Sequence, residues 1–309
     1  MQQQAEAVAP AAVRPVGMVA IIGRPNVGKS TLVNALVGER VSITSRKPQT
    51  TRDRVLGVRT DDDAQYIFVD TPGFQRRHRT ALNRRMNATV TSALVDVDAV
   101  VLVIAASGWT EGDEEMLTLL PPRTGDVPSN VILAINKSDL LAEREQMLPL
   151  MADSMQRYPF RAIVPVSAEK LRQLDDLLKE VRPLLPAGLL LFDAEQYTDR
   201  SVRFLAAESV REKAYRLLGD ELPYGIAVTI DRWDESRATP QIAATLIVER
   251  DAHRPIVIGK EGAKLREISR LARGDIEQML GKPVFLEVWV RVRRGWSDDA
   301  RALKSLGYE

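Results

Sequence analysis

The stretch Gly23-Arg-Pro-Asn-Val-Gly-Lys-Ser30 decides the fold of the first half of this chain. It fits the pattern G-x-x-x-x-G-K-[ST], in which the backbone N–H groups of a glycine-rich turn point at phosphate oxygens. An apolar run, 19–22, precedes it and a helical pattern, 31–37, follows it, so the turn opens onto a helix N-terminus that favours anions. The sequence therefore predicts a phosphate loop formed by Gly23, Arg24, Pro25, Asn26, Val27, Gly28, Lys29 and Ser30.

Short β-branched runs alternate with helical stretches on the C-terminal side of this loop. The runs are apolar throughout, which is typical of strands buried on both faces of a parallel sheet. They cover residues 19–22, 66–69, 99–104, 131–135 and 162–166. Residues 53–60 and 64–70 flank an acidic turn and predict a hairpin that adds one antiparallel edge strand. We expect an α/β domain over residues 16–185, with a mostly parallel sheet and helices on both faces.

The second half of the chain has a different pattern. Residues 1–15 are predicted to be a disordered tail and residues 186–200 a linker. A helical stripe over 201–218 is followed by strand-like runs at 226–233 and 242–249, a helix at 263–280 and a strand at 284–292. This order predicts an α+β domain over residues 201–309, which includes a C-terminal extension.

The composition excludes several kinds of site. The chain has 309 residues, no cysteine and two histidines, which rules out thiol chemistry and argues against a metal centre built on histidines. Its 43 basic and 42 acidic residues argue against indiscriminate nucleic-acid binding but leave room for a local basic patch. The longest apolar run, Ala99–Ala106, is too short to span a membrane, and the N-terminus lacks signal-peptide features, so we expect a cytoplasmic protein.

Two motifs at later strand ends extend the phosphate site. Lys29 is expected to bridge the β- and γ-phosphates and Ser30 to ligate Mg²⁺. Asp70-Thr-Pro-Gly73 closes a strand, so that Asp70 can hold Mg²⁺ through water and the Gly73 N–H can contact the γ-phosphate. The predicted contacts from this motif and the residue after it are Asp70, Thr71, Pro72, Gly73 and Phe74.

The motif Asn136-Lys-Ser-Asp139 selects the base. The Asp139 carboxylate can accept two hydrogen bonds from guanine, a pair that adenine does not offer, and an unpaired buried acceptor is heavily penalised. A backbone N–H of Ser167-Ala168 is expected to donate to guanine O6. The sequence thus predicts GTP as the nucleotide, bound in part by Asn136, Lys137, Ser138, Asp139, Ser167 and Ala168.

Three residues bear on hydrolysis. In Gln49-Thr-Thr-Arg-Asp53, we favour Thr51 over Thr50 as a Mg²⁺ ligand that binds only while the γ-phosphate is present. Phe74 stands where a water-orienting glutamine is often expected, so water must be positioned otherwise and intrinsic hydrolysis should be slow. The Asn26 amide can help to hold a K⁺ ion beside the phosphates. The predicted catalytic set is Lys29, Thr51, Gly73 and Asn26, with Ser30, Thr51 and Asp70 around the metal.

The second domain contains a G-x-x-G turn, Gly259-Lys-Glu-Gly262, which we place between a strand-like run, 256–258, and a helix. Such loops clamp about four nucleotides in KH domains. Residues 250–273 hold seven basic and three acidic side chains, a local excess of positive charge. The predicted RNA contacts are Ile258, Gly259, Lys260, Glu261, Gly262, Lys264 and Arg270. On the last strand, Phe285 and Trp289 alternate with core residues and either stack unpaired bases or pack on another element.

Together these residues resemble the Era family of bacterial GTPases, whose GTPase domain is followed by a type II KH domain. The resemblance covers about 17–309 and includes the segment from Ile43 to Arg52, the segment Glu221-Leu-Pro-Tyr224 and the terminal stretch from Trp296 to Tyr308. It implies binding to 16S rRNA near its 3′ end, a role in small-subunit assembly, and peripheral association with the inner face of the plasma membrane; we expect a monomer. In such proteins a hydrophobic residue replaces the glutamine, as Phe74 does. The segment Glu169–Arg172 lacks the glycine typical of that loop.

Alternative functions remain at this stage. A metabolic phosphotransferase would share the phosphate loop, but Asn136–Asp139 opposes it. A pure RNA-binding scaffold would need a degenerate nucleotide site, whereas every expected contact is present. A related GTPase that acts on the large subunit or on tRNA would carry the same motifs.

Overall fold

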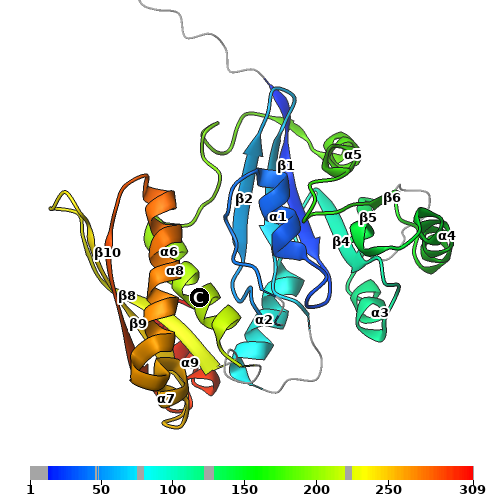
Figure 1. The fold of residues 1–309 in the computed structure, drawn as a ribbon. Helices are drawn as coiled ribbons and strands as arrows, with labels where there is room; N and C mark the ends of the chain where they lie inside the picture. Colours follow the sequence, from blue (N-terminus) through cyan, green and yellow to red (C-terminus); the bar gives the residue numbers. More distant parts are fainter. Residues whose placement is uncertain are drawn as a thin grey trace, which may run out of the picture.

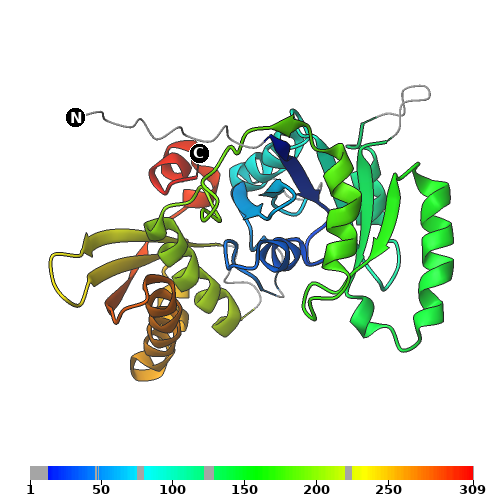
Figure 2. The same cartoon turned by 90° about the horizontal axis from the view of Figure 1, so that it is seen from above.

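A computed structural model describes residues 13–45, 47, 49–74, 80–121, 129–219 and 225–308. Two domains lie side by side, each with its own sheet (Figure 1 and Figure 2). The segment Glu221–Tyr224 noted in the sequence, and all but the last residues of the predicted tail, lie outside the described residues.

The first domain is built on a mostly parallel sheet with strand order β2-β3-β1-β4-β5-β6. Only the β2–β3 pair on this path is antiparallel, which confirms the predicted hairpin. The strands are β1 (Arg14–Ile22), β2 (Val55–Thr60), β3 (Gln65–Asp70), β4 (Ala99–Ala105), β5 (Val131–Asn136) and β6 (Ala162–Pro165).

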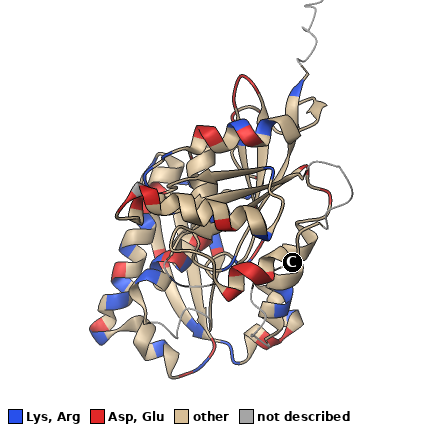
Figure 3. Cartoon of the chain, turned by 90° about the vertical axis from the view of Figure 1, so that its right-hand side faces the viewer, with Lys and Arg blue, Asp and Glu red and all other residues tan. Residues whose placement is uncertain are grey.

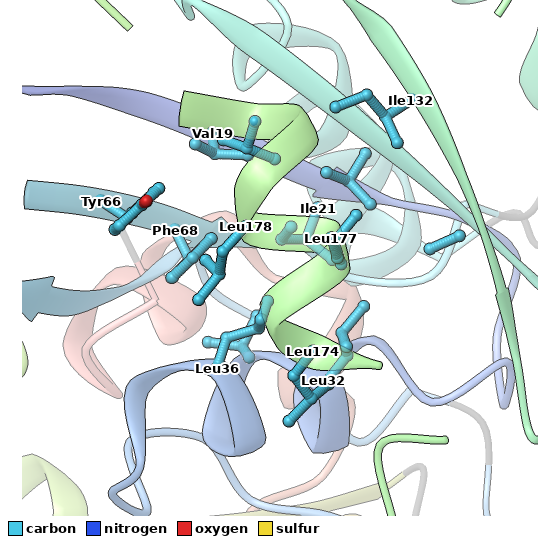
Figure 4. Close-up of a cluster of buried hydrophobic side chains, with 14 of the residues drawn as sticks. Val19, Ile21, Leu32, Leu36, Tyr66, Phe68, Ile132, Leu174, Leu177 and Leu178 are labelled. Carbon is cyan, nitrogen blue, oxygen red and sulfur yellow. The ribbon is translucent and has the colours of Figure 1, made fainter. Parts of the chain in front are cut away.

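Helices cover both faces of this sheet, which is why its strands are apolar throughout. One face carries α1 (Lys29–Val37) and α5 (Leu174–Val181), and Figure 4 shows Leu174, Leu177 and Leu178 packing toward the strands. The other face packs against the remaining helices, α2 (Ala81–Ser92), α3 (Glu111–Leu117) and α4 (Met147–Arg157). The predicted α/β class is confirmed, and the carboxyl ends of β1, β3 and β5 gather the motifs at one edge.

The segment 186–200 is attached to the first domain for much of its length. Its β7 (Ala187–Gly188) pairs antiparallel with the start of β1, so β1 begins two residues inside the predicted tail. Further along, the Val58 N–H donates to the Tyr197 carbonyl (2.9 Å) and Thr198 forms a bridge with Gly57. The segment therefore covers the edge strand β2, whose backbone groups would otherwise be open to another chain.

The second domain has a three-stranded sheet with order β10-β9-β8, in which β10 is parallel to β9 and β8 antiparallel. Helices α6 and α8 pack on one face of it. The elements are α6 (Val202–Leu217), β8 (Ile226–Asp234), β9 (Gln241–Val248), α7 (His253–Ile258), α8 (Ala263–Leu280), β10 (Phe285–Val292) and α9 (Ala300–Ser305). None of the helices within the described residues has the length and apolar character that spanning a membrane requires.

The strand expected at 256–258 is wrong, because these residues end the helix α7. Periodicity does not separate a short apolar run in a strand from one in a helix. Here Pro255 falls in the first turn of the helix, where a missing N–H is tolerated, and only Val257 is fully buried. The G-x-x-G turn therefore joins two helices.

Candidate nucleotide site and nucleic-acid interface

The phosphate loop leaves β1 and enters α1 around a buried ammonium group. Lys29 is 6% exposed, and its Nζ donates to the carbonyls of Gly23 (2.9 Å) and Arg24 (3.1 Å). Gly28 has φ 98°, and a Cβ there would lie 2.4 Å from Nδ2 of Asn136. Only glycine lets the loop and Asn136 approach this closely.

Burial lowers the pKa of Lys29 from 10.5 to about 8, although the nearby Asp70 carboxylate opposes the shift. Removing an ammonium from water disfavours its charged form, and a phosphate placed beside it favours that form again. A phosphate bound beside Lys29 would therefore favour the protonated form of this lysine.

Three oxygen-bearing side chains predicted around the metal meet beside the loop. Ser30 Oγ lies 2.6 Å from Thr51 Oγ1, which donates to Asp70 Oδ2 over 3.4 Å. Adjacent ligands of an octahedral Mg²⁺ with bonds of about 2.1 Å stand about 3 Å apart. Asp70 Oδ1 is buried and lacks a hydrogen-bond partner among the described residues, and burial raises the pKa of this carboxyl. The oxygen set and the orphaned atom fit a hard divalent cation.

The base-recognition motif is tied to the phosphate loop. Asn136 Nδ2 donates to the Val27 carbonyl (2.9 Å), and Lys137 Nζ donates to the Asn26 carbonyl (2.7 Å). Asp139 accepts from Ser167 Oγ at 2.5 Å. The strand ends therefore bring together segments that are more than 100 residues apart.

We expected a backbone N–H of Ser167 or Ala168 to donate to guanine O6, and in the structure both of these N–H groups donate to acceptors within the protein. The Ser167 N–H donates to the Arg172 carbonyl (3.2 Å), and the Ala168 N–H donates to Asn136 Oδ1 (3.0 Å). The loop closes without the glycine typical of it, because Leu171 (φ 53°) and Gln173 (φ 57°) adopt the left-handed conformation themselves.

The Asp70–Phe74 segment begins at the last residue of β3. Thr71 Oγ1 donates to the Ile21 carbonyl (2.8 Å), and Gly73 lies against Pro25 of the phosphate loop. Phe74 packs partly buried against the core beneath α2, α3 and α4, as expected of a residue that does not orient water. Residues 75–79 lie outside the described residues.

The G-x-x-G turn presents its central residues to solvent. Gly259 (φ 73°) could not carry a Cβ, which would lie 2.7 Å from that of Lys264. Lys260 and Glu261 are exposed and Lys264 is half-buried. Arg270 lies on α8 at a helix rise of about 12 Å beyond Gly262. There it forms a bidentate pair with Glu267 (both 2.8 Å). Of the predicted basic contacts, Lys260 thus lies within the turn and Lys264 just after it, whereas Arg270 stands apart from it.

The strand β10 bears out the predicted alternation. Trp289 is 62% and Phe285 is 51% exposed, so neither packs into a core, whereas Leu286 is buried. Along the ribbon as Figure 3 shows it, Lys and Arg positions are interspersed with Asp and Glu positions.

Comparison with known proteins now identifies the chain. Residues 18–137 match a family described as 50S ribosome-binding GTPase, and residues 221–297 match the KH domain. Over 95% of its length the chain is 54% identical to GTPase Era of Bordetella avium, of which it covers 97%, and 52% identical to GTPase Era of Bordetella pertussis, with the same coverage. The chain belongs to the Era family of GTPases.

Solved structures of Era show the same fold over nearly the whole chain. An Era crystal structure in complex with MgGDPNP and nucleotides 1506–1542 of 16S ribosomal RNA has a TM-score of 0.90 and 40% identity, covering 96% of this chain and 99% of that one. A variant of Aquifex aeolicus Era bound to GDP and AlF4⁻ has a TM-score of 0.89 and 40% identity, with 95% and 99% coverage. This Era-family protein is therefore a GTPase with a KH domain.

The two domains contact each other through pairs of residues that sequence reasoning did not bring together. We call residues 40–53 of this Era-family chain the switch segment; 46 and 48 within it are not described. Along α6, Glu212 Oε1 accepts from the Thr44 N–H (2.9 Å) and Arg211 donates to the Thr50 carbonyl (2.6 Å). Each pair is more than 160 residues apart, and no local pattern marks it.

Proposed function

We propose that this Era-family GTPase is a switch that binds the 3′ region of 16S rRNA and assists assembly of the small ribosomal subunit. The observation that carries the proposal is the likeness over both domains to the Era crystal structure with MgGDPNP and 16S rRNA. That likeness spans the nucleotide site and the G-x-x-G domain together. Era is the protein in that complex, and the assignment of its RNA to this chain is our inference.

On the nucleotide side, the buried Lys29 would bridge the β- and γ-phosphates, with Mg²⁺ held by Ser30, Thr51 and, through water, Asp70. The cation would neutralise the charge that develops on the phosphoryl oxygens. The Gly73 N–H would contact the γ-phosphate, and the Asp139 carboxylate would accept hydrogen bonds from guanine. GTP would thereby order the switch segment, and hydrolysis would release it.

Attacking water must be oriented without a glutamine, since Phe74 is packed against the core. Asn26 is an exposed residue of the phosphate loop, and its amide would help to hold K⁺ beside the phosphates. Turnover in K⁺ is then expected to exceed turnover in Na⁺ at equal ionic strength, and Asn26→Ala should remove the difference. Equal rates with the two cations in the wild type would contradict this role.

On the RNA side, Ile258–Gly262 and Lys264 would clamp single-stranded backbone, with Arg270 as a more distant contact. A fluorescent RNA copying the 3′ region of 16S rRNA tests this by anisotropy, against a scrambled RNA of the same length. Sequence-selective binding supports the proposal, and equal binding contradicts it. Because the matching family is described as binding the 50S ribosome, crosslinking to RNA in cells is the second arm. Reads on large-subunit RNA or on tRNA would favour the alternative.

We further infer a monomer in the cytoplasm with peripheral association at the inner face of the plasma membrane. This location rests on the family resemblance. Light scattering after size exclusion tests the mass, and membrane flotation with and without high salt tests the association. A stable dimer, or full recovery away from membranes in low salt, would contradict the corresponding inference.

A further inference from the structure

Arg52 follows Thr51 directly, yet its side chain points away from the nucleotide site and into the second domain. It is 2% exposed. Its Nη1 donates to the Ile226 carbonyl (2.6 Å) and to the Tyr308 hydroxyl (3.0 Å), and its Nη2 donates to the Tyr215 hydroxyl (2.6 Å). These partners come 163 to 256 residues later in the chain.

Three aromatic rings of the second domain surround the guanidinium. Its carbon lies 5.7 Å from the ring centre of Tyr215, 5.6 Å from that of Trp296 and 5.9 Å from that of Tyr308. Trp296 and Tyr308 are stacked on each other, 5.9 Å apart, and Trp296 Nε1 donates to the Gly225 carbonyl (3.3 Å). A planar cation that is always charged fits such a cage and its oxygen acceptors at once.

The backbone on the other side of Thr51 is held by the same domain. The Thr50 carbonyl accepts from Arg211 (2.6 Å) and the Gln49 carbonyl accepts from the Tyr215 hydroxyl (3.3 Å). Consecutive Cα atoms are 3.8 Å apart, so a shift of either neighbour moves Thr51 with it. The Thr51 hydroxyl, 2.6 Å from Ser30 Oγ, is thus positioned from the second domain as well as from the first.

We propose that Arg52 is a positioning residue: seated in the cage of Tyr215, Trp296 and Tyr308, it lets the second domain set Thr51 beside the metal and γ-phosphate. The inference rests on the proposed role of Thr51 as a ligand used with GTP and not with GDP. The cage therefore favours the GTP state selectively. By linkage, GTP favours the seated cage to the same degree.

The test compares Arg52→Lys, Tyr308→Phe and Thr51→Ala in the full chain. Affinities for MgGDPNP and MgGDP are measured by competition with a fluorescent nucleotide over a Mg²⁺ titration. Lysine keeps the charge, but its compact ammonium cannot reproduce the fixed fork by which Nη1 and Nη2 of Arg52 reach acceptors on different elements. Tyr308→Phe removes one hydroxyl that belongs to the second domain. We expect MgGDPNP affinity to fall about tenfold for Arg52→Lys and about threefold for Tyr308→Phe, scaled to typical coupling between sites. MgGDP affinity should change less than about twofold.

Arg157→Lys is the matched control, because Arg157 also lies over a ring, 5.2 Å from that of Trp109, but on α4. It should change neither affinity. The double variant Arg52→Lys with Tyr308→Phe should lose no more MgGDPNP affinity than Arg52→Lys alone. Tyr308→Phe removes a contact that Arg52→Lys already breaks. Thermal melts check folding, and if Arg52→Lys does not fold, Tyr308→Phe carries the comparison.

Equal losses for MgGDPNP and MgGDP would reduce Arg52 to a structural role and overturn the proposal. A selective loss in Thr51→Ala without one in Arg52→Lys or Tyr308→Phe would also overturn it, while leaving the proposed function intact. If Thr51→Ala itself shows no selective loss, the metal assignment in the proposed function fails, and the positioning role fails with it.

Discussion

The nucleotide site and the G-x-x-G turn are built in opposite ways. The first gathers buried groups, such as Lys29, Asp70 and Asn136, from five segments of the chain. These groups are bonded to one another or to the loop, as Lys29 and Asn136 are to carbonyls of the phosphate loop. The second is a run of consecutive residues whose central pair, Lys260 and Glu261, is exposed. Changes in the first should therefore propagate through shared contacts, whereas changes in the second should act on the ligand alone.

Removing the Asp139 carboxylate should give the largest difference between the effect on nucleotide affinity and the effect on RNA affinity. If Asp139 accepts two charge-assisted hydrogen bonds from guanine as proposed, each worth about 1.5–3 kcal/mol, Asp139→Ala should lower GTP affinity about 10³-fold. Fluorescent GTP titration measures it, and RNA affinity without nucleotide should stay within twofold. Asp153→Ala, on the exposed face of α4, is the control. A loss below tenfold would contradict base recognition by Asp139.

Reversing a charge in the turn should produce the converse effect. Lys260→Asp would replace the proposed phosphate contact by a repulsion, so RNA affinity should fall about 30-fold. The salt dependence of RNA binding should weaken by about one phosphate contact or more. GTP affinity should not change. Anisotropy at several salt concentrations measures both, with Lys304→Asp on α9 as the control. An equal loss in Lys304→Asp would make the effect non-specific.

The pH dependence of GTP binding sharpens the comparison, because burial in the nucleotide site lowers the pKa of Lys29. Lys29 has a pKa of about 8 in the free protein, and bound phosphates favour its charged form. Affinity is therefore full below pH 8 and falls as the pH rises through it, about tenfold between pH 7 and 9. Calorimetry at pH 8.5 in buffers of different ionisation enthalpy should show roughly three quarters of a proton taken up. No proton uptake would contradict this account of Lys29.

The smallest effect is expected on the sheet of the second domain. Trp289 is 62% exposed, so Trp289→Ala should leave the melting temperature within about 2 °C. If it stacks a base, RNA affinity should fall about fivefold, the lower end for such contacts. An unchanged RNA affinity would remove Trp289 from the interface and leave the G-x-x-G turn as the proposed contact.

Local patterns predicted much of the molecule. Flanking strand and helix identified Gly23–Ser30, and the alternation on β10 placed Trp289 outside the core, because each pattern depends on neighbouring residues. The run 256–258 failed because three apolar residues fit a helix and a strand equally well.

Long-range contacts could not be predicted from such patterns. Arg52 and Tyr308 are 256 residues apart, and nothing local to either marks them as partners. Similarly, no pattern in 186–200 indicates that Thr198 bonds to Leu56, since the exposed edge of β2 that it covers exists only in the folded sheet. The motifs were thus predictable, and the contacts between the domains were not.

The central claim is that nucleotide and RNA affinities are linked. Kd for the 3′-region RNA should be measured for the same protein saturated with MgGDPNP and with MgGDP, in one buffer. A linked switch predicts tighter RNA binding in the MgGDPNP state, by about fivefold or more. Equal affinities in the two states would contradict the switch and leave two independent modules on one chain.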